Sequence, residues 1–204
     1  MKIIQTKLKD MPSSLLAELG SYRYRLFARE EGWSITSRIS TPGQEYDRFD
    51  CSEVCWFIAW HAQHGICGCA RLMPWCCPEN AEISEDERQY LENCTAWEIS
   101  RFSARQEIDN ELPLKILWHA VQVAEQSGAG HLFGSTTPML GTLFDDYRVN
   151  YKKLPSGIIQ SENNLLSVNI PVSQPQLATR FHDSRCFKPE EVLPSLGMSV
   201  DWNV

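Results

Sequence analysis

Acidic and basic side chains recur at short, fixed spacings in the first half of this chain. Asp47 and Asp50 stand three residues apart, Glu98 precedes Arg101 by the same interval, and Arg71 ends an apolar run. Such a group can bind a substrate that carries both an ammonium and a carboxylate, because opposite charges neutralise one another where water is excluded. A carboxylate among apolar neighbours can also act as a general base, since desolvation raises its pKa.

A second group combines a guanidinium with aromatic rings. Phe27 follows Arg23 by four residues, and Trp33 follows Phe27 by six. An aromatic face attracts a nearby cation by ~1 kcal/mol or more when the pair is desolvated, so this group can hold a cationic ligand. The alternative is an amphipathic helix that buries Phe27 and Trp33 and leaves Arg23 in solvent.

Each carboxylate also has a structural interpretation. Asp47 and Asp50 are typical of a surface turn, and Glu98 can be an ion-pair member that holds a sheet together. Arg71 and Arg101 fall in predicted core strands, where an unpaired guanidinium is costly, so both need acidic partners. Side chains alternate along a strand, so Glu98 and Arg101 face opposite sides unless a bulge intervenes. We therefore expect a charge cluster and leave open whether Glu98 is catalytic or structural.

The elements that position these residues follow from hydrophobic periodicity. Apolar residues at helical spacing predict helices that start near residues 13 and 113, and a shorter helix at 138–144. Runs rich in aliphatic and aromatic residues predict strands near 1–6, 54–62, 66–73, 95–103, 132–136 and 165–170, while 34–44 indicates a loop. This order predicts an α+β architecture, with a mixed central sheet flanked by helices in a single domain over residues 1–204.

Composition and charge argue against several classes of function. The 204 residues carry a net charge of -7, which disfavours a general binder of nucleic acids or of anionic membranes, because both partners are negatively charged. No apolar run is long enough to span a bilayer and the N-terminus lacks a signal-peptide pattern, so we expect a cytoplasmic protein. The eight cysteines do not form zinc-like pairs, so reduced thiols and no metal are expected. Cys67 and Cys69 are expected to share one face of a strand.

The order and spacing of these motifs resemble those of the acyl-homoserine lactone synthases of the LuxI type. The matching residues lie in order in the first half of the chain: Arg23, Phe27, Trp33, Asp47, Asp50, Arg71, Glu98 and Arg101. The resemblance implies a fold similar to the GCN5-type N-acetyltransferases. It also implies an acyltransferase that makes an N-acyl-L-homoserine lactone, a quorum-sensing signal, from a fatty-acyl thioester and S-adenosylmethionine. S-adenosylmethionine is then a substrate, no cofactor is needed, and methylthioadenosine is released.

The resemblance also implies roles for individual residues. The catalytic residues are expected to be Glu98, Asp50 and Arg101. The residues expected to bind S-adenosylmethionine are Arg23, Phe27, Trp33, Asp47, Arg71 and Phe102. The acyl pocket is expected to be lined by Trp97, Trp118, Gly134, Met139 and Leu143. Members that make 3-oxo signals often carry Thr where Gly134 aligns, so the sequence favours an acyl chain without the 3-oxo group.

The acyl donor is open to two interpretations. Relatives often carry basic residues where this chain has Asp145 and Asp146, and those residues meet the acidic acyl carrier protein. Here Arg148, Lys152 and Lys153 follow just beyond and are expected to dock the carrier. Acyl-coenzyme A is the alternative donor, although residues 101–110 lack the glycines that cradle its pyrophosphate in ordinary acetyltransferases. We therefore expect an acyl carrier protein thioester.

Two other functions fit the same elements. One is a GCN5-type N-acyltransferase that acylates an amino acid or a peptide amine, for which the group of Arg23, Phe27 and Trp33 has no use. The other is a non-catalytic ligand-binding domain, for which the charged residues around Glu98 are surplus. Release of methylthioadenosine separates both from a lactone synthase.

Overall fold

The computed structural model describes residues 1–30, 42–75, 95–154, 165–196 and 198. Trp33 and most of the loop expected at 34–44 lie outside the described residues. The strands are β1 (Lys2–Lys7), β2 (Cys55–His61), β3 (Gly65–Pro74), β4 (Ala96–Ala104), β5 (His131–Thr136), β6 (Lys152–Lys153), β7 (Leu166–Pro171) and β8 (Cys186–Phe187). The α-helices are α1 (Ser13–Arg23), α3 (Leu112–Gln126), α4 (Pro138–Asp146), α5 (Pro175–Phe181) and α6 (Pro189–Val192).

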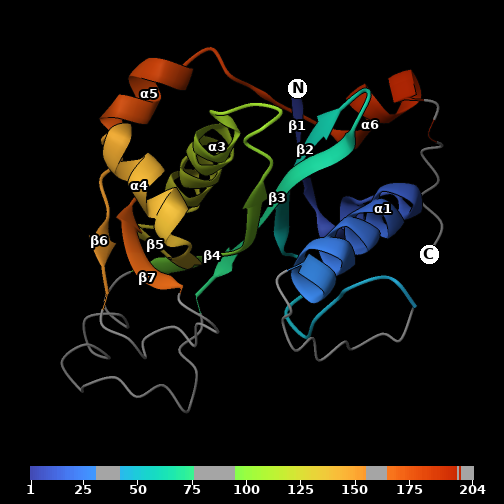
Figure 1. Ribbon diagram of the computed structural model, residues 1–204, viewed down its shortest axis with the longest axis horizontal. Coiled ribbons are helices and arrows are strands. Elements are labelled where there is room, and N and C mark those ends of the chain that lie inside the picture. Colours follow the sequence, from blue (N-terminus) through green and yellow to red (C-terminus); the bar gives the residue numbers. More distant parts are fainter. Residues whose placement is uncertain (31–41, 76–94, 155–164, 197, 199–204) are drawn as a thin grey trace.

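One mixed sheet forms the centre of the molecule (Figure 1). Its strand order is β6-β7-β5-β4-β3-β2-β1-β8, with parallel pairing between β4 and β5 and between β1 and β8. β4 and β5 pair only from Ala96 opposite His131 to Ile99 opposite Gly134, although both strands continue further. The two central strands therefore separate at the level of Ile99.

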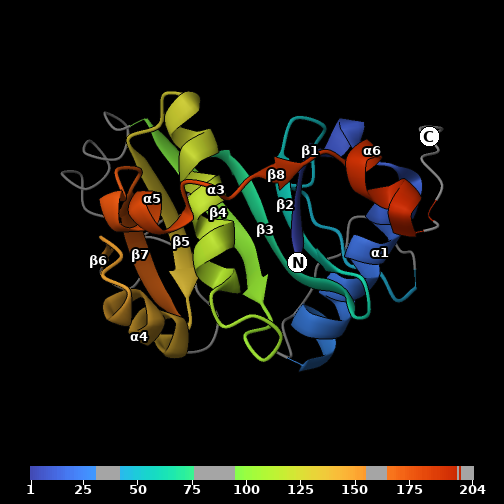
Figure 2. The ribbon, with the colours of Figure 1, turned by 90° about the horizontal axis from the view of Figure 1, so that it is seen from above.

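Hydrophobic cores lie on both faces of this sheet. α3 covers one face, where Leu117 joins Phe57 of β2 in a core, and α1 covers the other, where Leu19 joins Trp56 and Ile58. Neighbouring residues of β2 thus alternate between the two cores, as the pleat of a strand requires. We call these the α3 face and the α1 face. Figure 2 shows α4 and α5 beside the edge that carries β6 and β7, and α6 beside α1 at the other end.

The predicted α+β architecture, with a mixed sheet flanked by helices, is confirmed. The six strands and three helices predicted above from periodicity are present, with bounds that differ from prediction by one or two residues. The first helix differs more, because α1 ends at Arg23 and a π-helical turn over Tyr24–Glu30 carries Phe27. The short strand β6 and the elements after residue 171, which are α5, β8, α6 and a 3-10 turn over Leu193–Leu196, were not predicted, and each spans seven residues or fewer. Within the described ranges, no helix is both long and apolar enough to cross a membrane.

A β-bulge overturns one expectation about the cysteines. The register of β3 against β2 shifts between Ala59 and Trp60, which leaves an extra residue in β3. As a result Cys67 joins the core on the α3 face and Cys69 the core on the α1 face. The prediction that the two thiols share a face is wrong, because the bulge interrupts the alternation between them. The five described cysteines carry free thiols.

Candidate active site

Three acidic residues of the site, Glu45, Asp47 and Asp50, lie on a short segment that crosses α1. Glu45 donates its backbone N–H to the carbonyl of Gly20 at 3.0 Å, and the Tyr46 hydroxyl donates to the carbonyl of Leu16 at 2.9 Å. A side chain at Gly20 would overlap the Tyr46 ring, so glycine permits this close approach. Arg23 follows Gly20 by three residues on the same helix. The segment and the helix therefore deliver opposite charges to one place.

A second β-bulge brings Arg101 to this place. The register of β4 against β3 shifts between Cys69 and Arg71, so that Arg101 and Phe102 stand opposite a single residue. Arg101 has a φ of 50°, in the left-handed region that residues other than glycine rarely adopt. The extra residue turns Arg101 onto the α1 face, where Ser100 also points, while Phe102 packs against the core on the α3 face. The sheet thus separates Phe102 from Arg23, Asp47 and Arg71, the members of the charged group expected to bind S-adenosylmethionine.

Three arginines and three carboxylates meet on the α1 face. We call this group the charge cluster: Arg23, Glu45, Asp47, Asp50, Arg71 and Arg101. Arg71 Nη1 lies 2.6 Å from Asp47 Oδ1 and 2.9 Å from Asp50 Oδ1. The formal charges of the cluster cancel, and the prediction that the strand arginines have acidic partners is confirmed.

Glu45 ties the other two arginines together. Its carboxylate pairs with Arg23 Nε through one oxygen and lies 3.0 Å from Arg101 Nη2 through the other. Arg101 Nη2 is also 2.8 Å from Asp47 Oδ2, and Arg23 Nη1 is 3.0 Å from Asp50 Oδ2. Glu45 is fully buried, and the sequence analysis missed its role. A count of charges could have found it, because two aspartates leave one of three buried guanidiniums without a counterion.

Burial and charge in the cluster act on the pKa values in opposite directions. Burial alone raises the pKa of Asp47, but the charge and hydrogen bond of Arg71, with Arg101 and Arg23, outweigh it and hold this pKa below its ordinary value. Burial lowers the pKa of Arg71, but Asp47 and Asp50 outweigh it and the net shift is upward. Asp47 and Arg71 therefore both stay charged near neutral pH. Among the described residues, no group of three or more His, Cys, Asp or Glu is placed to bind a metal ion.

Aromatic rings surround the guanidiniums of the cluster. The Arg23 guanidinium lies 4.8 Å from the ring centre of Trp56, and that of Arg71 lies 5.8 Å from it. Phe27 is buried, and its ring centre lies 5.5 Å from the Arg101 guanidinium. The cluster is least covered at Arg101, whose side chain is 18% exposed, whereas that of Arg23 is 1% exposed. A ligand can therefore approach Arg101 more readily than Arg23.

Glu98 lies beside the cluster on the α1 face. It stands opposite Met73 in the β3–β4 ladder and two residues before Ser100, whose hydroxyl accepts a hydrogen bond from Arg71 Nε at 3.1 Å. Burial raises the pKa of Glu98, and the charge of Arg71 and a hydrogen bond with Ser100 offset this only in part. The Glu98 carboxylate is therefore a stronger base than an exposed glutamate.

The residues expected to line the acyl pocket lie on the α3 face or at the surface. Trp97, Trp118 and Leu143 are half-buried against the core on the α3 face. Gly134 approaches β4 so closely that a Cβ there would lie 2.7 Å from a backbone oxygen. Met139, in the first turn of α4, is 68% exposed. The structure therefore brings three of the five to one core and leaves Met139 in solvent.

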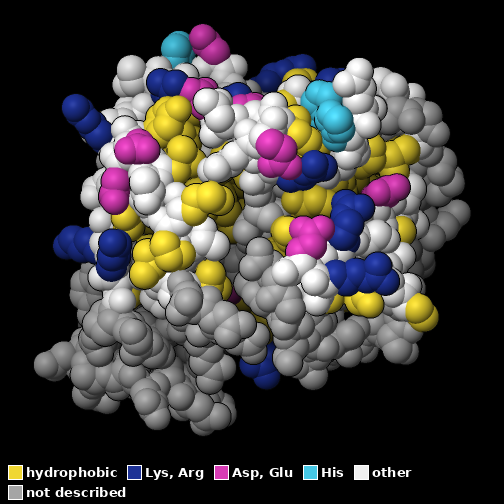
Figure 3. All heavy atoms as spheres, in the orientation of Figure 1, with side chains coloured by type: hydrophobic (Ala, Val, Ile, Leu, Met, Phe, Trp, Pro, Cys, Tyr) yellow, Lys and Arg dark blue, Asp and Glu magenta, His cyan; other side chains and the backbone are white. Residues whose placement is uncertain are grey.

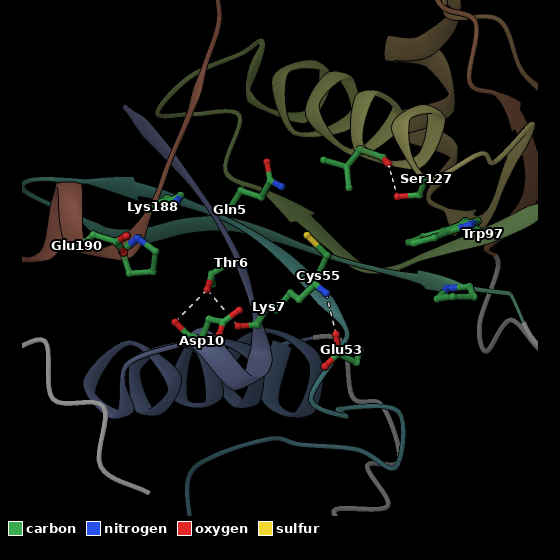
Figure 4. Close-up of a pocket in the computed structure, with 13 residues that line it drawn as sticks. Gln5, Thr6, Lys7, Asp10, Glu53, Cys55, Trp97, Ser127, Lys188 and Glu190 are labelled. Carbon is green, nitrogen blue, oxygen red and sulfur yellow. Dashed lines mark hydrogen bonds and ion pairs between the residues drawn. The ribbon is translucent and has the colours of Figure 1, made fainter.

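A cavity of about 710 Å³ also lies on the α3 face (Figure 4). Trp97 and Cys55 form part of its wall, while Lys7, Glu53 and Lys188 line it with charged groups. Lys7 and Glu53 pair with each other at 2.7 Å. The sheet separates this cavity from the charge cluster, so we do not assign it to the candidate active site.

The residues expected to dock a carrier protein are exposed near one edge of the sheet. Lys152 and Lys153 form β6, and Figure 3 shows basic side chains at this edge. Arg148 follows α4 with a φ of 54°, at the position where a helix usually ends in glycine. Asp145 accepts a hydrogen bond from the Tyr151 hydroxyl at 2.9 Å. One of the two acidic residues that weakened the docking prediction is thus engaged within the chain.

The chain resembles known proteins both in sequence and in fold. No protein-family model matches the chain. An acyl-homoserine-lactone synthase of Pseudomonas aeruginosa is 30% identical over 192 residues, which cover 89% of this chain and 93% of that protein. The structure of TofI in a ternary complex with an inhibitor and MTA has a TM-score of 0.68 and 26% identity. The match covers 91% of this chain and 98% of the TofI chain.

More distant structures share the fold alone. BjaI, a CoA-dependent acyl-homoserine lactone synthase, has a TM-score of 0.63 at 16% identity, and the match covers 98% of this chain and 91% of that one. A putative N-acetyltransferase from Lactobacillus plantarum has a TM-score of 0.53 at 15% identity, with coverage of 84% and 98%. The N-acetyltransferase-like fold is confirmed. The identity and coverage of the Pseudomonas aeruginosa match show that this chain belongs to the acyl-homoserine-lactone synthase family.

Proposed function

We propose that the protein makes an N-acyl-L-homoserine lactone from S-adenosylmethionine and an acyl carrier protein thioester. Its membership of the synthase family supports the product, and the MTA (methylthioadenosine) in the TofI complex supports the released nucleoside. The observation that carries the proposal is the position of Glu98. This carboxylate, with a raised pKa, lies beside a cluster whose charges suit an amino acid substrate.

The reaction needs two bond exchanges. In the first, the α-amine of S-adenosylmethionine loses a proton and attacks the thioester carbonyl, which forms the amide and releases the thiol. In the second, an oxygen of the methionyl carboxylate attacks the carbon next to the sulfonium, which closes the lactone and releases methylthioadenosine. The second step consumes one negative and one positive charge and needs no proton. Only the first step therefore requires a base.

The charged residues fit these steps with distinct roles. Glu98 takes the amine proton, because its raised pKa makes it a stronger base than an exposed carboxylate. Arg101, the more accessible guanidinium, binds the methionyl carboxylate, and the partly exposed Asp47 holds the ammonium before deprotonation. Asp50 bridges Arg23 and Arg71 and positions them. The thioester is expected to reach Glu98 where β4 and β5 separate.

A test of this proposal follows the products. The pure protein is incubated with S-adenosylmethionine and a mixed pool of acyl donors, and both products are measured by mass spectrometry. We expect methylthioadenosine and an acylated lactone in equal amounts. An acylated amino acid without methylthioadenosine would instead indicate the N-acyltransferase alternative, and no product from any donor would contradict catalysis.

We propose the acyl carrier protein rather than coenzyme A as the donor's carrier. The exposed positive charges of Arg148, Lys152 and Lys153 complement an acidic protein, and long-range attraction of this kind mainly speeds docking. Arg148 supports this proposal, because its φ of 54° is a conformation that glycine adopts without strain. A basic residue stands there instead, although it strains the backbone. Acyl-coenzyme A remains the alternative, since BjaI combines CoA dependence with the same fold.

Reversal of charge at β6 is expected to weaken use of the carrier protein. With Lys152→Glu and Lys153→Glu combined, the KM for acyl carrier protein should rise by about tenfold, and its salt dependence near ~0.15 M should flatten because the screened attraction is gone. The KM for the matching acyl-coenzyme A should change much less. Arg185→Glu, which reverses a 70% exposed charge beside β8, serves as the control. A native enzyme that prefers acyl-coenzyme A and ignores these reversals would overturn the choice of donor.

A further inference from the structure

The position of Arg101 depends on the β-bulge in β4. In a regular strand Arg101 would alternate with Ser100 and face the core on the α3 face, which contains Ile99. A guanidinium there would meet none of the three carboxylates of the charge cluster. The bulge avoids this, but it places a non-glycine residue at a φ of 50°. A backbone conformation of this kind persists only where neighbouring groups enforce it.

Three side chains on the α1 face bond to both sides of the bulge. The Cys69 thiol donates to the carbonyl of Arg101 at 3.2 Å, and the backbone N–H of Cys69 donates to Ser103 Oγ at 3.3 Å. The hydroxyl of Tyr22, on α1, lies 3.1 Å from Ser103 Oγ. Cys69 of β3 thus bonds to the Arg101 carbonyl and to the Ser103 side chain, and Tyr22 of α1 bonds to Ser103 as well.

The surroundings keep these groups in their bonding state. Cys69 is fully buried and Tyr22 is nearly so. Burial raises the pKa of the Cys69 thiol to about 11, and a hydrogen bond with Ser103 opposes this only in part. Burial also raises the pKa of Tyr22. Both groups therefore keep their protons at neutral pH, so the Cys69 thiol remains a donor and Tyr22 keeps a hydroxyl that can donate or accept.

We propose that Cys69, Ser103 and Tyr22 are positioning residues that hold the bulge and thereby aim Arg101 at the charge cluster and the substrate. We call the three residues the bulge clamp. The clamp acts on the backbone of β4 and does not touch the substrate. Its effect on turnover rests on the proposed role of Arg101 in binding S-adenosylmethionine, whereas its effect on the bulge does not.

Cys69→Ala removes the thiol donor and is expected to lower kcat/KM for S-adenosylmethionine by about tenfold, because a displaced guanidinium binds the carboxylate poorly. Most of the loss should appear in KM. Cys69→Ser restores an O–H donor and should recover most of the activity. Cys67→Ala is the matched control, since Cys67 is also buried in β3 but faces the other core and bonds within its own strand, to the Gly65 carbonyl.

A second measurement does not depend on activity. Amide hydrogen exchange in the peptide that contains residues 101–103 should be faster in Cys69→Ala than in Cys67→Ala. The two variants are compared at temperatures equally far below their melting temperatures, so that a difference in global stability does not account for the result. If Cys69→Ala fails to fold, Tyr22→Phe tests the same clamp, with a smaller increase in KM and in exchange. Equal kinetics and equal exchange in the cysteine variants would overturn the clamp. Altered exchange in Cys69→Ala, together with a wild-type protein that releases no methylthioadenosine, would support the clamp and count against the proposed function alone.

Discussion

Glu98→Gln is expected to lower kcat by about 100-fold or more, while S-adenosylmethionine still binds. Glutamine keeps the shape of the side chain and can still bond to Ser100, but it cannot accept the amine proton. The measurement is kcat from methylthioadenosine release, with binding of S-adenosylmethionine followed by calorimetry. Glu125→Gln makes the same substitution at an exposed position of α3 and should leave both values unchanged. An unaltered kcat would make Glu98 a structural residue.

The pH dependence of the same pair of proteins gives an independent reading. Burial raises the pKa of Glu98, so the wild-type base becomes protonated, and kcat falls, at a higher pH than the ordinary glutamate value of about 4.3 would give. Glutamine does not titrate, so this acid limb should be lost in Glu98→Gln. High pH should partly rescue the variant, because more of the substrate amine is then already deprotonated. A variant that keeps the wild-type limb would assign it to another group.

Asp50→Asn and Arg71→Ala are each expected to abolish most lactone formation and to destabilise the fold by ~3 kcal/mol or more. Both side chains are buried, with Arg71 Nη1 2.9 Å from Asp50 Oδ1, so removal of either leaves a charge without its full set of partners. The free energy of unfolding measured in urea gives the stability, and lactone yield gives the activity.

The double variant separates pairing from independent damage. If the two residues share one cluster, Asp50→Asn combined with Arg71→Ala should cost much less than the sum of the single changes. Arg71 also pairs with Asp47 at 2.6 Å, so the remaining cost should exceed that of a simple two-residue bridge. Strict additivity would mean that Asp50 and Arg71 do not interact in solution.

The sequence was sufficient for the elements and for most of the cluster, and the reasons are physical. Continuous runs of aliphatic and aromatic residues locate β2 and β3, which bury both faces, and helical spacing locates α3, which buries one. The arginines of β3 and β4 needed counterions, which pointed to Asp47 and Asp50. The short elements after residue 171 have too few residues for periodicity to be visible.

Other features of the site were beyond pattern analysis. The alternation of side chains along a strand predicted that Arg101 and Glu98 lie on opposite faces of the sheet. Only the register between β3 and β4 reveals the bulge that puts both on the α1 face. Phe102 moved to the α3 face for the same reason. The path of the 44–50 segment across α1 depends on a contact between Gly20 and Tyr46, which are far apart in sequence. Tertiary contacts of this kind leave no local pattern.

The internal neutrality of the charge cluster has a consequence for selectivity. The zwitterionic amino acid end of a substrate can exchange partners with Arg101 and Asp47 and leave both of these protein charges matched. A ligand that brings only an amine, or only a carboxylate, would strand one protein charge in a poorly hydrated place and bind weakly for that reason. The cluster can therefore select ligands that carry both an amine and a carboxylate. It would exclude decarboxylated or deaminated analogues of its substrate without any steric barrier.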